Sequence, residues 1–161
     1  MALFITNNNN ITNFETTYHV LLSTELNKSF SAYGNLKKQI SQFAQSQSFE
    51  GNFNESFIFN EIDNEKSSSK KFIGLGTKKD LTNEKIFRCA SSITYSIVSS
   101  KQKISSLQIV LPNSFDNIKI DKNSNEEVER FINRFNSKTK REFNKITFKN
   151  FINRFFLAYS G

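Results

Sequence analysis

The stretch that decides the fold runs from Lys71 to Leu111. It opens with Lys71-Phe72-Ile73-Gly74-Leu75-Gly76, an apolar segment that is typical of a strand ending at glycine. Apolar residues then recur at helical spacing over 81–101. Leu107-Gln108-Ile109-Val110-Leu111 follows as a second apolar strand, closed by Pro112, the only proline. Strand, helix and strand in this order, over about 40 residues, predict a right-handed crossover between two parallel strands.

Shorter patterns upstream add to this unit. Leu3-Phe4-Ile5 and Tyr18-His19-Val20-Leu21-Leu22 are rich in strand formers and predict two further strands. Between Leu26 and Gln45 the apolar residues recur every three or four positions, which predicts a helix whose first half is weakened by Gly34. We therefore expect an α/β fold in which a mixed, mainly parallel sheet is flanked by helices as a three-layer sandwich.

The stretch between these patterns predicts a turn, a strand and a connector. Phe49-Glu50-Gly51-Asn52 is typical of a turn, and Phe57 and Phe59 alternate with polar neighbours as in a half-buried strand. Residues 64–70 include three serines and are expected to form a flexible connector. For the helix over 81–101, Thr82 or Asn83 is placed to cap the start.

The length of 161 residues allows one domain, which we divide into a neutral α/β body (1–112) and a basic helical segment (113–161). Within the second part, apolar residues at helical spacing predict one helix that contains 128–135 and another from about residue 147. The lone Cys89 cannot form an intramolecular disulfide, and the sequence shows no apolar run of about 20 residues. These features favour a soluble, intracellular protein without a membrane partner.

The net charge of +7 is concentrated in residues 130–161, which hold eight basic side chains and one acidic side chain, Glu142. The rest of the chain is neutral. One interpretation is a solvated basic helix face opposite a Phe/Ile stripe; the other is a docking surface for nucleic acid or an acidic protein. The candidate contacts for such a partner are Arg130, Arg134, Lys138, Lys140, Arg141 and Lys145.

Residue patterns that would support catalysis are scarce. His19 is the only histidine and lies in a strand pattern, so a buried or surface role with one hydrogen bond is favoured over a catalytic base. Cys89 falls in the middle of the predicted helix, where a small inert thiol is the common outcome. Gly74-Leu75-Gly76 lacks the third glycine of a dinucleotide fingerprint and favours a tight turn. We assign no catalytic, cofactor-binding or metal-binding residue.

Several segments are informative as an ordered set. They are the expected helix end Leu36-Lys37-Lys38-Gln39-Ile40, then Phe49-Glu50-Gly51, Lys71 to Lys78, Leu81 to Val98, Gln108 to Pro112, and Phe155-Phe156-Leu157-Ala158-Tyr159-Ser160. In this order they resemble the N-terminal domain of the leucyl aminopeptidases, a family of cytosolic metallo-exopeptidases. The resemblance covers most of residues 30–112 and about the last ten, and the long stretch 113–149 departs from it.

This resemblance implies a macro-domain-like α/β fold, a cytoplasmic location and a non-catalytic role. In the family, two divalent metals, Zn or Mn, lie in a separate C-terminal catalytic domain, and the assembly is a hexamer. The family's Asn-Thr-Asp-Ala-Glu-Gly-Arg block has no counterpart here. We therefore expect no cofactor in this chain, and a catalytic domain of the same protein and further copies as partners. The macro-domain relationship also raises an ADP-ribose pocket, for which the glycines are sparse.

Overall fold

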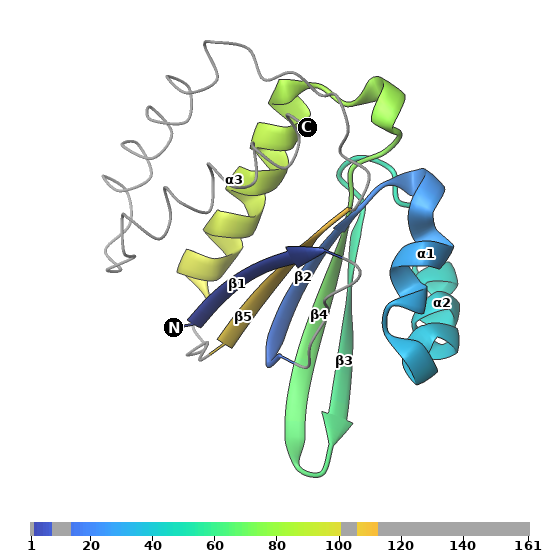
Figure 1. Cartoon of the computed structure of the whole chain (residues 1–161), viewed down its shortest axis with the longest axis vertical. Helices are drawn as coiled ribbons and strands as arrows, with labels where there is room; N and C mark the ends of the chain where they lie inside the picture. The colour runs from blue at the N-terminus through green and yellow to red at the C-terminus, as the bar shows by residue number, and fades with distance from the viewer. Residues whose placement is uncertain (1, 8–13, 101–105, 113–161) are drawn as a thin grey trace. The chain divides into compact units, whose positions relative to one another are not determined.

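The structure is a computed structural model that describes residues 2–7, 14–100 and 106–112 (Figure 1). Five strands form one mixed sheet in the order β1-β5-β2-β4-β3. All neighbouring strands are parallel except β3, which pairs with β4 in the antiparallel sense. The elements are β1 (Ala2–Asn7), β2 (Thr16–Leu21), α1 (Leu26–Ser31), α2 (Lys37–Ser46), β3 (Ser56–Asp63), β4 (Lys66–Gly74), α3 (Asn83–Ser99) and β5 (Ser106–Leu111).

The predicted α/β class, with a mixed and mainly parallel sheet and helices, is confirmed. Strands β4 and β5, which precede and follow α3 in the sequence, are parallel to each other as expected, because both run parallel to β2. They are not neighbours, since β2 lies between them in the sheet. The five strands with α1 and α2 belong to one compact unit, and α3 belongs to a second.

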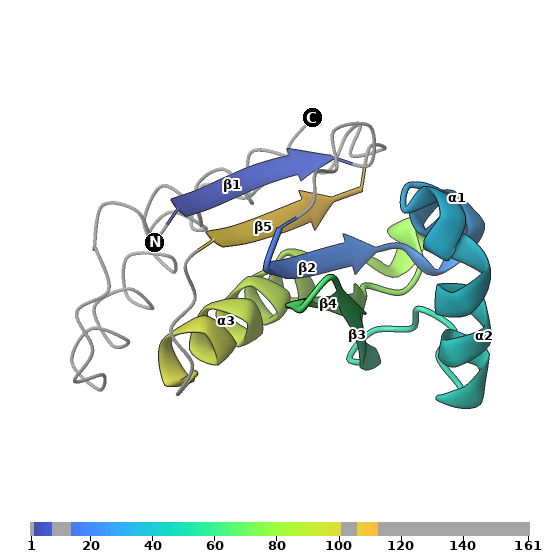
Figure 2. The same cartoon turned by 90° about the horizontal axis from the view of Figure 1, so that it is seen from below.

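The single helix expected over 26–45 is two helices. Gly34 has a left-handed φ of +59°, a conformation that glycine adopts without steric cost. Because this residue cannot continue the helical path, α1 ends at Ser31 and α2 begins at Lys37, with a short 3-10 turn at Gly34–Leu36 between them. Figures 1 and 2 show the two helices side by side next to one end of the sheet.

An aromatic core joins α1 and α2 to β2, β3 and β4. Phe72 of β4 is fully buried, stacks on Phe57 of β3 at 4.8 Å between ring centroids, and meets Phe30 of α1 edge-on at 5.3 Å. Of the regularly spaced apolar residues between Leu26 and Gln45, Phe30 and Ile40 are buried as predicted, whereas Phe43 is exposed. Burial of such side chains stabilises a fold by about 1.5–3 kcal/mol each.

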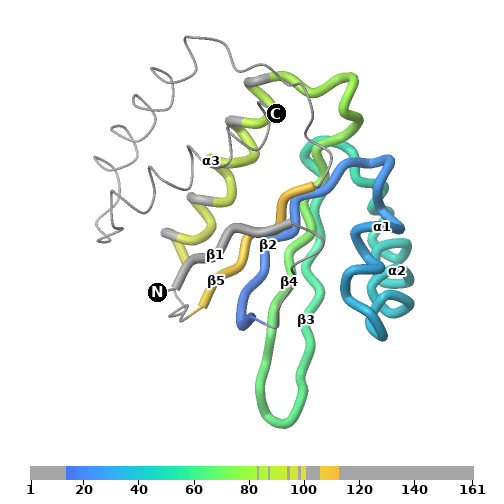
Figure 3. Tube along the Cα trace, viewed as in Figure 1, coloured from blue at the N-terminus to red at the C-terminus, as the bar shows by residue number. Residues whose placement is uncertain are grey.

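The connector expected over 64–70 is instead a two-residue turn followed by a strand. Asn64 and Glu65 both have left-handed φ values, +48° and +68°, which is the geometry of a type I′ hairpin turn. Strand β4 therefore begins at Lys66, and the serines form its first half. The resulting β3–β4 hairpin extends beyond the start of β2 (Figures 1 and 3).

Helix α3 begins as the sequence predicts. The Thr82 hydroxyl caps it by accepting a hydrogen bond from the backbone N–H of Lys85 (3.3 Å). The regularly spaced apolar residues of this helix are buried: Ile86, Ala90, Ile93 and Ile97. Arg88 and Glu84, one helical turn apart, form an exposed ion pair. No helix in the part of the chain that the structure describes is long and apolar enough to span a membrane. The helices predicted after Pro112 lie outside that part.

Candidate functional site

Polar side chains are buried along one face of the sheet. Gln108 of β5, Thr17 of β2 and Lys70 of β4 are partners in register and therefore share a face. All three are at most 5% exposed, as is His19, two residues further along β2 on the same side. Buried polar groups are costly without partners, so each one identifies a position where the interior must supply a partner.

His19 is held between aromatic rings. Its Nδ1 atom lies 2.7 Å from the Tyr33 hydroxyl, and its ring stacks on Phe72 at 5.4 Å. Its Nε2 atom has no hydrogen-bond partner among the described residues. Burial lowers the pKa of the His19 imidazole to about 3, because a charged ring there would lose its hydration. Burial likewise raises the pKa of the Tyr33 hydroxyl far above its usual range, so both groups are neutral at physiological pH.

Lys70 brings a positive charge into this buried layer. Its Nζ atom lies 3.2 Å from a carboxylate oxygen of Glu61 and donates to the Ser68 hydroxyl at the same distance. It also lies 5.9 Å from the centre of the Tyr33 ring, within the range of a cation–π contact. Counting side-chain atoms alone, the lysine is 7% exposed and the glutamate 27%, so Glu61 connects the buried ammonium to the surface.

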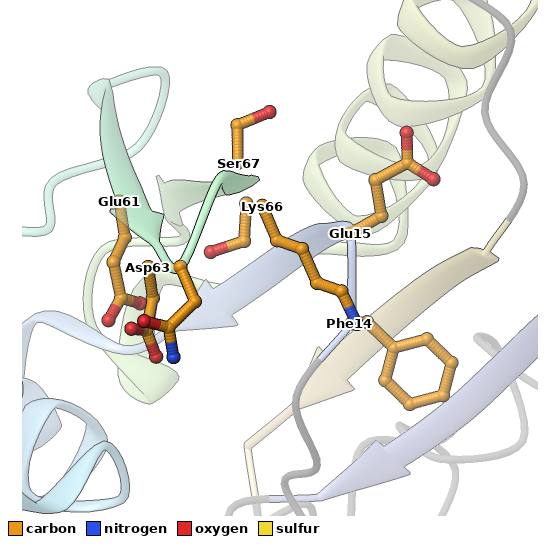
Figure 4. Close-up of a pocket in the computed structure, with 8 residues that line it drawn as sticks. Phe14, Glu15, Glu61, Asp63, Lys66 and Ser67 are labelled. Carbon is orange, nitrogen blue, oxygen red and sulfur yellow. The ribbon is translucent and has the colours of Figure 1, made fainter.

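Glu61 also lines a cavity of about 650 Å³ at the turn end of the β3–β4 hairpin. In Figure 4 the Lys66 side chain extends toward Phe14, while Glu61 and Asp63 lie on the other side of the opening. The lining comes from the segment just before β2 and from the hairpin. The lining residues are Phe14, Glu15, Glu61, Asp63, Asn64, Lys66, Ser67 and Ser68.

The lining of this cavity is mainly polar and carries a net negative charge. Three carboxylates and one ammonium give its lining a formal charge of −2, and hydroxyl and amide groups add hydrogen-bonding capacity. Among residues 14–100 and 106–112, no group of three His, Cys, Asp or Glu side chains is placed to hold a metal ion. Glu61 is paired with Lys70, and the other two carboxylates of the lining are those of Glu15 and Asp63.

The glycine motif lies at the end of β4, in close contact with a second backbone segment. A Cβ atom on Gly74 would collide with the backbone oxygen of Asn52 and lie within 2.6 Å of backbone atoms of Gly51. The N–H of Gly76 donates to the Gly51 oxygen, and the Gly76 oxygen accepts from the N–H of Ser23, both at 2.9 Å. The glycines thus let two backbone segments touch at the carboxyl ends of β2 and β4.

Of the residues singled out in the sequence, only some fall in the described part. His19 is buried with one hydrogen bond, as favoured, and Cys89 is a buried thiol that forms no disulfide with another described residue. The basic residues proposed as partner contacts, Arg130 to Lys145, lie outside it. The Lys70–Glu61 pair was not predicted from the sequence. Spacing was the available signal, because Lys70 stands two residues before Phe72 and Glu61 two residues after Phe59. Both charged residues therefore lie on the same face of their strands as these inward-facing phenylalanines.

Comparison with protein-family models and with curated proteins finds no match. The functional interpretation therefore rests on the residues and the geometry above.

Proposed function

We propose that this chain is the non-catalytic N-terminal domain of a leucyl-aminopeptidase-like metallo-exopeptidase. Its role is architectural: it packs on a catalytic domain and contributes to the assembly of a homo-oligomer. The peptidase chemistry, with its two divalent metals, belongs to the catalytic domain, and no residue of this chain is assigned to it.

One observation carries the proposal, namely the order of the segments that resemble the family. Leu36 to Ile40, expected at the end of a helix, falls instead at the start of α2, and Phe49-Glu50-Gly51 falls in the connection between α2 and β3. The Gly-Leu-Gly motif begins at the last residue of β4, and Gln108 to Leu111 form the end of β5, which Pro112 follows. Consecutive matching segments thus correspond to consecutive structural elements, which supports a common fold more strongly than any single motif.

The use of chemically active residues also supports a structural role. His19 is buried and neutral beside Tyr33, and Cys89 is buried within α3. A general base needs access to its substrate and a pKa near the working pH, and His19 has neither. The Gly-Leu-Gly motif holds backbone against backbone, a packing function that leaves its N–H groups engaged within the chain at Leu75 and Gly76.

The proposal is tested by association in trans. A leucyl aminopeptidase catalytic domain, expressed without its own N-terminal domain, is mixed with this chain, and the mass of the complex is measured by light scattering. We expect both chains to elute together in an assembly larger than either alone. Gly74→Ala places a Cβ atom against the backbone of Gly51 and Asn52, so this variant should lose the association. Glu84→Gln alters an exposed side chain and should retain it. Separate elution of the wild-type chain would count against the proposal.

A second candidate function follows from the eight basic residues in 130–161. In this alternative the segment binds nucleic acid or an acidic protein surface through its charge. Its test is a titration with duplex DNA at increasing salt, because each phosphate contact makes affinity fall with salt. Binding that weakens steeply and disappears when 130–161 is deleted would favour this alternative, and undetectable binding at low salt would remove it.

A further inference from the structure

Strand β3 is a long edge strand. It is last in the sheet order, pairs with β4 on one side, and is eight residues long. Edge strands in natural proteins are usually protected by Pro, by charged side chains (Lys above all), by bulges or by being short. Ser56–Asp63 contains neither Pro nor Lys, and every residue of it is paired in register with β4 without a bulge. Its two charged residues are Glu61, which is paired with Lys70 of the neighbouring strand, and Asp63, which is the last residue before the turn. The strand therefore has the form of a pairing edge.

The hairpin geometry fixes which backbone groups face outward. The two-residue turn makes Asp63 and Lys66 a hydrogen-bonded pair. At the other end of the hairpin, the N–H of Gly74 donates to the Glu55 oxygen (2.9 Å). Glu55 lies eight residues before Asp63, so the two observations agree on which alternate residues bond to β4. Alternate residues from Glu55 to Asp63 thus bond to β4. The backbone groups of Ile58, Asn60 and Ile62 consequently point away from the sheet.

The same residues expose apolar side chains. Ile58 is 50% exposed and Ile62 is 81% exposed, and they are two of the four exposed large apolar residues in the part of the chain that the structure describes. Asn60, between them on the same face, is also exposed. One strip of the edge therefore combines unpaired backbone groups with the pattern Ile, Asn, Ile, which reads the same in both directions.

This symmetry selects the occupant. In an antiparallel pairing of two copies centred on Asn60, Ile58 lies opposite Ile62 of the second copy, and Asn60 lies opposite Asn60. Residues whose backbone groups point away from β4 then lie opposite each other along the whole pairing, so they can form the hydrogen bonds of an antiparallel ladder. A pairing centred on Phe59 would place Ile58 opposite Asn60, and one centred on Glu61 would place two carboxylates opposite each other, which is destabilising.

We propose that two copies of this chain associate through β3 in an isologous dimer centred on Asn60, which joins their sheets into one. In this register Glu61 lies opposite Phe59 rather than a like charge, and its own charge is countered by Lys70. The inference depends on the edge alone. It holds whether or not the chain associates with a peptidase domain, so the two can fail separately.

The register is tested by cysteine cross-linking of the full chain. Directly opposed residues of a hydrogen-bonded pair have Cα atoms about 5.5 Å apart, within reach of a disulfide. We expect Asn60→Cys to form a disulfide-linked dimer under mild oxidation. Ser56→Cys, equally exposed on the same strand, is the matched control: its copies would lie roughly 27 Å apart by strand rise and should not cross-link. Cross-linking of both variants, or of neither, would overturn the register.

Affinity gives an independent readout. Asn60→Pro removes one outward N–H from each copy while leaving the β3–β4 ladder intact, since Pro is tolerated on an edge strand. We expect the dimer dissociation constant, measured by sedimentation, to rise about tenfold or more, with unchanged circular dichroism. Asn60→Ser, which keeps the N–H, should dimerise like the wild type. The proposal would be refuted by a wild-type chain that stays monomeric at about 100 μM. It would also be refuted if Asn60→Pro left the dimer dissociation constant unchanged.

Discussion

The two ends of the β3–β4 hairpin differ in how the same pair of strands is used. At the end beside α1 and α2, Phe57 and Phe72 stack inside an aromatic core. Toward the turn, the paired positions hold Glu61 and serines, Ile62 is 81% exposed, and an open polar cavity replaces the core. The fold is thus stabilised at one end of the hairpin, which leaves the other end available for contacts.

The largest contrast between the two ends should appear on deletion of a side chain. Phe72→Ala removes a fully buried ring from the core and should lower the free energy of unfolding by about 3–5 kcal/mol. Ile62→Ala removes a comparable apolar side chain at the exposed end and should change it by less than about 0.5 kcal/mol. Urea denaturation of both variants measures the difference. Similar losses would mean that the turn end is packed in solution.

The pH dependence of stability tests the buried layer between the two ends. Because the pKa of His19 is lowered to about 3, the unfolded chain binds a proton below pH 6.5 and the folded chain does not. Stability from this residue is therefore complete above pH 6.5 and falls as the pH drops toward 3, by up to about 1.4 kcal/mol per pH unit. His19→Leu should show a shallower dependence in urea titrations between pH 7 and pH 4. Equal slopes would contradict a neutral, buried imidazole.

The Lys70–Glu61 pair should respond asymmetrically, because its two members differ in burial. Glu61→Gln leaves a buried ammonium without its carboxylate and should cost about 1–3 kcal/mol. Lys70→Met leaves a carboxylate that is already 27% exposed and can be hydrated, so it should cost less. Thermal unfolding of the two single variants and the double variant gives the coupling. A larger cost for Lys70→Met would show that the glutamate, not the lysine, depends on the pair.

The smallest expected effect lies at the turn itself. Glu65 has a left-handed φ of +68°, a backbone conformation that costs conformational energy for residues other than glycine and asparagine. Glu65→Gly creates an Asn-Gly turn and should stabilise the chain by about 1 kcal/mol. Asn64→Ala, the matched change in the other direction, should destabilise it. A destabilising effect of Glu65→Gly would mean that Glu65 makes a contact in solution that outweighs the strain.

The elements with local signals could be predicted from the sequence. The strand ending at Gly74, the helix capped by Thr82 and the strand closed by Pro112 all follow from short-range rules of periodicity and capping. The serine-rich start of β4 did not, because Ser67 to Ser69 have low strand propensity and are held by pairing with β3. Tertiary pairing overrides local preference there.

The buried polar layer and the cavity depend on contacts between distant residues. Thr17, Lys70 and Gln108 come from three strands and become neighbours only once the sheet order is known. The cavity joins Phe14 to a turn about 50 residues later in the chain, a proximity that the parallel pairing of β2 with β4 creates. No window of local sequence carries that information.

We propose that this chain has a structural role and leaves peptide hydrolysis to another domain. The decisive experiment measures the release of leucine from leucine amide by the purified chain, with added manganese or zinc, across the elution profile. We expect no metal-dependent release in the fractions that contain the chain, while a leucyl aminopeptidase assayed in parallel is active. Turnover that co-elutes with the chain and is abolished by a chelator would contradict it.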